Sequence, residues 1–285
     1  MKGIGLALLL ACAGSAVAQP VTRAASMANR ADFQLTGTAT QGGMLTGIAP
    51  AGTVALQLDD QLVPVDADGR FLIAFDRDAG PTARLTARLP DGRTIDRPLT
   101  VASRDWRIER IDAPMHPTKS SEAFLTLRKP ELAAIAAARA TVTDAQGWRQ
   151  SFIWPRVGRI SGQFGSQRIY QGTPGAYHGG VDVAGTTGLP VVAPADGVVI
   201  LAATDKPFTL EGHLLMIDHG HGLNSAFLHL SRIDVKLGDH VAQGQRIGAI
   251  GATGRATGPH LHWGMKWNEA RIDPMLIAGP MPNGL

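Results

Sequence analysis

Histidines gather in the second half of this 285-residue chain, where eight of the nine lie at or after residue 178. Histidine is not a favoured filler of a β core, so this clustering indicates a chemical role. Two pairs have spacings that suit a metal site: His178 with Asp182, and His260 with His262. Imidazole nitrogens and carboxylate oxygens are both ordinary ligands of zinc.

The first pair requires a bend in the chain. In a straight strand, residues four apart share a face but lie about 13 Å from each other. The ligands of one zinc ion lie only about 2.0–2.2 Å from it, so a straight strand would hold His178 and Asp182 too far apart. Gly179 and Gly180 follow His178 and give the backbone the freedom to bend there. We therefore expect His178 to lie on a bend.

The second pair suits an ordinary strand. Residues two apart point to the same side, with α-carbons about 6.6 Å apart, so His260 and His262 would converge while Leu261 points into the core. Each pair alone arises easily by chance or as surface histidines. Together they offer two imidazoles and one carboxylate, with a third imidazole close by. Three protein ligands with an open fourth position are typical of catalytic zinc, although cobalt and manganese accept the same ligand types.

The motifs around these residues resemble those of the lysostaphin/LytM-type zinc metallopeptidases. The resemblance is dense and extends over about residues 154–276. Its main motifs are FGSQR at 164–168, HGGVDVA at 178–184, PVVAPADGVV at 190–199, LMIDHG at 215–220, FLHLS at 227–231, GATG at 251–254 and GPHLHW at 258–263.

The resemblance implies a role for five residues. It implies that His178, Asp182 and His262 bind one Zn²⁺ per chain, and that His229 and His260 are catalytic, without showing which of these two is the general base. The implied activity is hydrolysis of peptide cross-links in peptidoglycan, by a water that the metal activates and with histidine acid/base assistance. Degenerate relatives that only activate other wall hydrolases have lost ligands. A non-catalytic, wall-bound activator is therefore the alternative, and all five positions are filled here.

Three residues before the first ligand are candidates for the substrate groove. Arg168, Tyr170 and Tyr177 lie in a loop-like segment and could hold a substrate carboxylate or the oxyanion. The other histidines, including His213, have surroundings that favour solvated or supporting roles.

Apolar periodicity predicts a mainly β chain with two domains. Residues 33–114 alternate apolar and polar positions between turn signals, which indicates a small antiparallel sandwich that resembles bacterial immunoglobulin-like modules. A helical linker is expected over 115–150, with its helix beginning at Pro130 and running to about residue 140. A β-rich peptidase domain of antiparallel sheets is expected over 151–276, and a tail over 277–285.

The N-terminus predicts export. Lys2, an apolar run over 4–13 and an A-x-A site at 16–18 are typical of a signal peptide over residues 1–18, followed by a flexible start over 19–32. The alternative is a lipoprotein acylated at Cys12, and only then do we expect contact with a membrane. The expected location is the periplasm, with the outer membrane or secretion as alternatives.

Composition excludes several classes of protein. The formal net charge is only +3, aromatic residues make up 5%, and the chain has no run of basic residues, so a nucleic-acid partner is not expected. A single cysteine excludes a disulfide framework and any cysteine-rich metal site. The expected partners are peptidoglycan and, through the N-terminal domain, a regulatory protein.

Overall fold

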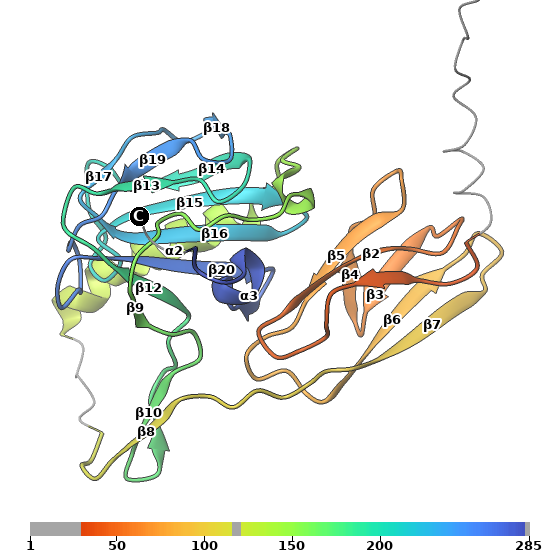
Figure 1. Cartoon of the computed structure of the whole chain (residues 1–285), viewed down its shortest axis with the longest axis horizontal. Helices are drawn as coiled ribbons and strands as arrows, with labels where there is room; N and C mark the ends of the chain where they lie inside the picture. Colours follow the sequence, from red (N-terminus) through yellow and green to blue (C-terminus); the bar gives the residue numbers. More distant parts are fainter. Residues whose placement is uncertain (1–29, 116–120, 283–285) are drawn as a thin grey trace, which may run out of the picture.

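The computed structural model describes residues 30–115 and 121–282. The expected signal peptide, Cys12 and most of the expected flexible start lie outside these ranges. Strands dominate the described chain, and the expected mainly β fold is confirmed. Figure 1 shows two β-rich units side by side, joined by an extended segment. No helix in the described part of the chain combines the length and apolar character needed to cross a membrane.

The N-terminal unit consists of two antiparallel sheets that share one apolar cluster. The first has the order β1-β2-β5 and the second the order β4-β3-β6-β7. Leu56, Leu85 and Phe71 are buried in the cluster that the sheets share, as the alternation predicts. The strands are β1 (Gln34–Thr36), β2 (Met44–Ile48), β3 (Ala55–Leu58), β4 (Gln61–Val63), β5 (Arg70–Ala74), β6 (Thr82–Arg88) and β7 (Thr94–Thr100).

The C-terminal unit is built on a long antiparallel sheet. Its order is β18-β14-β15-β16-β20-β12-β9, with β21 beside β20, and a smaller sheet has the order β13-β19-β17. Leu215, Phe227 and Trp263 are fully buried on one face of the long sheet. The strands are β9 (Ile160–Gly162), β12 (Gly180–Ala184), β13 (Pro190–Val192), β14 (Gly197–Ala202), β15 (His213–Gly220), β16 (Leu223–Leu230), β17 (Arg232–Ile233), β18 (His240–Val241), β19 (Arg246–Ala249), β20 (His260–Trp267) and β21 (Ala270–Ile272).

A ribbon of three short strands connects the units. Strand β8 (Ile108–Ile111) pairs in parallel with β10 (Gln167–Tyr170), which pairs with β11 (Thr173–Pro174). Residues 108–111, within the expected sandwich range, thus add a strand to the C-terminal part of the chain. Figure 1 shows this ribbon below the C-terminal unit, with the extended segment before β8 leading from the sandwich to it.

The expectation for the helix start is wrong. Helix α2 runs from Glu122 to Ala140, so Pro130 lies inside it rather than in its first turn. Proline removes one helix hydrogen bond, but two other features stabilise the first half. Ser121 caps the helix by accepting a hydrogen bond from the backbone of Phe124, and Arg128 is bound to Glu211 outside the helix.

The second half of α2 packs on the long sheet. Ile135 and Ala138 contact a cluster that includes Leu214 and Met216 of β15, and Figure 1 shows the helix behind this sheet. The other helices within residues 30–115 and 121–282 are a 3-10 turn, η1 (Gly147–Arg149), and α3 (Pro274–Ala278).

His219 gives the C-terminal unit a pH-dependent stability. It is fully buried in β15, where its Nδ1–H donates to the Asp196 carbonyl at 2.8 Å and its Nε2 accepts from Ser225 at 2.9 Å. Burial lowers the pKa of His219 to about 4. The folded state therefore binds this proton less readily than the unfolded state. The resulting stability is fully present above about pH 6.5 and is lost as the pH falls towards 4.

We expect the stability advantage of the natural protein over a His219→Asn variant to shrink by about 3 kcal/mol between pH 7 and pH 4. Urea unfolding of both proteins at each pH measures this difference, and groups common to both cancel. The exposed His240, changed to Asn, is the matched control and should show no such shrinkage. An advantage that stays constant with pH would contradict a neutral, buried His219.

Candidate metal centre and active site

Strand register brings the two expected ligand pairs together. In the antiparallel pair of β12 and β20, Asp182 lies directly opposite His262. Alternation along β20 places His260 on the same face as His262, while Leu261 between them is fully buried. Neighbouring strands of one sheet therefore bring together residues that are eighty positions apart in the chain.

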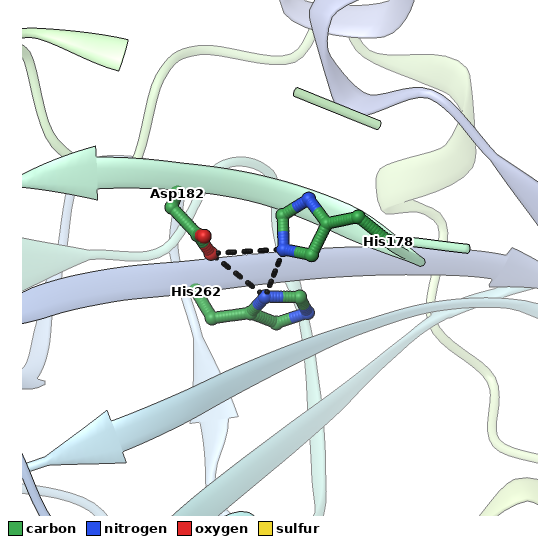
Figure 2. Close-up of side chains that lie close together, drawn as sticks. All are labelled: His178, Asp182 and His262. Atoms are coloured by element: carbon green, nitrogen blue, oxygen red, sulfur yellow. Dashed lines mark hydrogen bonds and ion pairs between the residues drawn. The ribbon is translucent and has the colours of Figure 1, made fainter. Parts of the chain in front are cut away.

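His178 completes the cluster from outside the strands. It lies just before β12, where the described backbone is not a strand. Its Nε2 is 3.1 Å from Asp182 Oδ1 and 3.0 Å from His262 Nδ1, and the latter two atoms are 2.9 Å apart (Figure 2). Three nitrogen and oxygen donors this close fit a single divalent ion with bonds of about 2.0–2.2 Å.

The surroundings hold these side chains in position. The Nδ1–H of His178 donates to the Gln163 carbonyl at 3.0 Å, which leaves its Nε2 lone pair directed at the cluster. Metal-binding histidines commonly have such a partner on the second nitrogen. Two glycines leave the necessary room, because a Cβ at Gly162 would collide with the Asp182 carboxylate and one at Gly180 would crowd His262.

The charges in the cluster suit metal binding. Burial alone would raise the pKa of Asp182, but the neighbouring imidazoles of His178 and His262, in their protonated forms, hold that pKa well below its usual range. Burial lowers the pKa of His262. Burial would also lower the pKa of His178, but the hydrogen bond and charge of Asp182 outweigh it and raise the value. An ionised carboxylate and a neutral His262 are the forms that bind metal.

The two expected catalytic histidines lie beside this cluster. The ring centres of His229 and His260 are 4.9 Å apart, and that of His229 is 6.3 Å from the His262 ring. His260 Nε2 is 3.7 Å from Asp182 Oδ1. The structure thus brings all five residues to one place, at the bottom of a hollow of about 390 Å³.

Hydrogen bonds fix which nitrogen of each catalytic candidate carries the proton. His229 Nδ1 lies 2.9 Å from the Thr253 carbonyl, and His260 Nδ1 lies 2.8 Å from the Gly258 carbonyl. A carbonyl only accepts hydrogen bonds, so Nδ1–H is the donor in both rings and each Nε2 is free to take a proton. Burial lowers the pKa of His229, which keeps its ring neutral at pH 7.

A backbone irregularity directs His229 into the site. Its φ is +63°, a conformation that non-glycine residues seldom adopt. Regular alternation along β16 would place His229 on the core side with Phe227. Instead it lines the hollow together with Leu228, and Leu230 is fully buried in the core. Such strain is often found at functional sites.

The groove candidates lie next to the cluster but have other contacts. Arg168, Tyr170 and Tyr177 line a groove of about 1030 Å³ that also reaches His178 and Asp182. Arg168 makes an ion pair with Glu109 at 2.8 Å and is largely exposed. The Tyr177 ring lies against the guanidinium groups of Arg77 and Arg271.

Sequence reasoning missed some residues at this site. Arg255 borders all three hollows around the cluster, and Glu211 borders two of them. The backbone carbonyls of Gln163 and Thr253 orient the imidazoles. Thr253 lies in the GATG motif, but the other three positions have no spacing or motif that relates them to the histidines, and only the folded chain places them here. His219, expected to be solvated or supporting, is buried away from solvent.

Comparison with known proteins identifies the domain that carries this cluster. The sequence model of peptidase family M23 matches residues 176–274. The chain is 39% identical over 128 residues to the peptidoglycan DD-endopeptidase ShyA of Vibrio cholerae. The aligned region covers 45% of this chain and 29% of ShyA. The chain is 38% identical over 105 residues to the DD-carboxypeptidase/endopeptidase Mpg of Neisseria meningitidis, covering 37% of this chain and 24% of Mpg.

A solved structure extends the likeness beyond this domain. A Pseudomonas aeruginosa structure assigned to peptidase M23 matches with a TM-score of 0.64 and 28% identity, over 85% of this chain and 96% of that one. Residues 176–274 therefore form a peptidase M23 domain, and the resemblance drawn from the motifs is confirmed. The chain spans less than a third of the length of the two curated relatives.

Proposed function

We propose that this protein is a zinc-dependent endopeptidase that hydrolyses the peptide cross-links of peptidoglycan. The observation that carries the proposal is the convergence of His178 Nε2, Asp182 Oδ1 and His262 Nδ1 within 3.1 Å of one another, beside two further imidazoles. The match of residues 176–274 to the model of peptidase family M23 supports the reaction class. The similarity to ShyA, which is named a peptidoglycan DD-endopeptidase, supports peptidoglycan as the substrate.

Three of the five residues would bind the metal, and the other two would transfer protons. A zinc ion held by His178, Asp182 and His262 would supply a Lewis acid that acidifies water and polarises a carbonyl oxygen. His229 accepts the proton of the attacking water at Nε2, because Thr253 holds the proton of this neutral ring on Nδ1. His260, whose ring centre lies 4.9 Å from that of His229, supplies the second proton transfer, to the leaving amine, or a hydrogen bond to the oxyanion.

A non-catalytic activator of another wall hydrolase is the competing proposal. Such a protein does not need a complete ligand set or neutral imidazoles beside it. All five residues are present here and lie together, which favours the enzyme.

Muropeptide analysis tests the proposed activity. Purified protein with zinc should convert cross-linked muropeptides of isolated cell walls into uncross-linked products, and mass spectrometry of these products identifies the bond that is cut. A chelator should stop the conversion, and added zinc should restore it. Unchanged walls after zinc supply, together with faster cleavage by an added hydrolase, would favour the activator instead.

The remaining expectations on the whole chain form part of the proposal. We propose export to the periplasm through residues 1–18, because the wall lies outside the cytoplasm. Membrane attachment follows only if Cys12 is acylated. We also propose that residues 33–114 are an accessory domain of immunoglobulin-like type that binds a regulatory protein or helps target the wall. Its hydrogen bonds to the C-terminal unit, such as Arg77 to the Gly165 carbonyl at 3.0 Å, support a fixed position beside the peptidase domain.

A further inference from the structure

A second groove leads away from the metal cluster. It has a volume of about 640 Å³ and runs between helix α2 and the face of the long sheet that carries His262. Its floor includes Met216 and Ala226, and Ile135 of α2 forms part of its wall. Figure 1 shows α2 lying along this sheet. The groove is therefore continuous with the proposed active site.

The groove is strongly cationic. Its bordering cations are Arg128, Arg139, Arg255, Lys266 and Arg271. Glu211 is the one carboxylate among its bordering residues, and both of its oxygens accept hydrogen bonds from Arg128 at 2.6 Å. This pair neutralises itself, so the other four cations leave the groove with excess positive charge.

Two of these cations, Arg139 and Lys266, are partly or wholly buried. Arg139 lies in the last turn of α2, and its buried Nε has no hydrogen-bond partner among the described residues. Lys266 Nζ contacts Glu269 at 2.9 Å, but the Glu269 side chain is 98% exposed. Burial lowers the pKa of Arg139, and the charge of Arg271 lowers it further. Burial likewise lowers the pKa of Lys266.

Burying a cation is unfavourable unless an anion lies beside it, and an anion placed between Arg139 and Lys266 would relieve that cost. Lys266 is four residues beyond His262 in the same strand, a distance of about 13 Å. An extended peptide spans this distance with about four residues. The anion would thus lie well away from the scissile bond yet on the same bound chain.

We propose that Arg139 and Lys266 form a subsite for a free carboxylate of the substrate peptide. This inference rests on the proposed function and adds a specificity to it: peptides that carry free carboxyl groups bind better than the same peptides with those groups amidated. The subsite recognises a carboxylate rather than a particular side chain, because guanidinium and ammonium groups provide only donors.

The test measures binding of an uncross-linked stem peptide, which contains no cross-link to cut. The probes are this peptide with free carboxyl groups and its fully amidated form, titrated calorimetrically into the zinc-loaded protein. The natural protein should bind the free form about 10-fold more tightly or better. Arg139→Gln should abolish this preference while leaving the affinity for the amidated form unchanged, and Lys266→Gln should reduce it.

Lys129→Gln is the matched control, because it removes one positive charge from the exposed side of the same helix. It should retain the full preference. Equal affinities of the natural protein for both peptides, or an equal loss for both in Arg139→Gln, would overturn the subsite. The amidation comparison needs no variant, so equal affinities would overturn the subsite even if a substitution impairs folding. If the protein hydrolyses cell walls but binds both peptides equally, only the subsite is overturned. If it prefers the peptide with free carboxyl groups but does not hydrolyse cell walls, only the proposed activity is overturned.

Discussion

Replacing Asp182 with alanine should remove both bound zinc and hydrolysis, lowering kcat/KM by at least about 1000-fold. Asp182 Oδ1 lies within 3.1 Å of the donor atoms of His178 and His262, so its loss leaves two neutral imidazoles without the anionic ligand. The remaining pair holds a dication weakly. Zinc content after gel filtration, and cleavage of purified cell walls, measure the two effects on one preparation.

Two further variants make this result specific. Asp182→Asn keeps the size of the side chain and removes its charge, so it should also lose zinc while the fold remains intact by circular dichroism. His240→Ala removes an exposed imidazole in β18, away from the cluster, and should keep both zinc and activity. Full zinc content in Asp182→Ala would show that residue 182 is not a ligand.

Replacing His229 with alanine should have the second-largest effect and should separate binding from catalysis. We expect kcat to fall by about 100- to 10,000-fold, the usual contribution of a positioned acid or base. The zinc content should not change, because the ring centre of His229 lies 6.3 Å from that of His262 and outside the donor triangle. KM should change little.

The assignment of His229 depends on both measurements together. Loss of zinc along with activity would make His229 a ligand rather than a base, and retention of both would remove it from the mechanism. His260→Ala, measured in the same way, shows which of the two imidazoles contributes more to the rate.

Much of the metal cluster could be predicted from the sequence because its geometry is local. Residues two positions apart in a strand share one face of the sheet, and β20 therefore presents His260 and His262 on the same face. The bend before Asp182 also follows from local chemistry, since a straight strand cannot bring a residue four positions away to the same ion. The register that sets Asp182 opposite His262 is a long-range property. At that step the family resemblance, rather than spacing, supplied the link.

Other features depend on contacts that no local pattern contains. The left-handed φ of His229 reverses the alternation of β16, so periodicity alone would bury this residue in the core. Helix α2 begins before Pro130 because Arg128 is bound to Glu211, more than eighty positions later. The pairing of β8 with β10 likewise joins segments far apart in the chain. The cationic groove also depends on long-range contacts, because helix α2 places Arg139 there and the long sheet places Lys266.

A crystal structure of the protein grown with zinc, with anomalous diffraction recorded at the zinc edge, tests the central claim most directly. The account predicts one strong anomalous peak per chain, about 2.0–2.2 Å from His178 Nε2, Asp182 Oδ1 and His262 Nδ1. An empty triangle at full zinc supply, or a peak bound elsewhere with the Asp182 carboxylate turned away from it, would contradict the account.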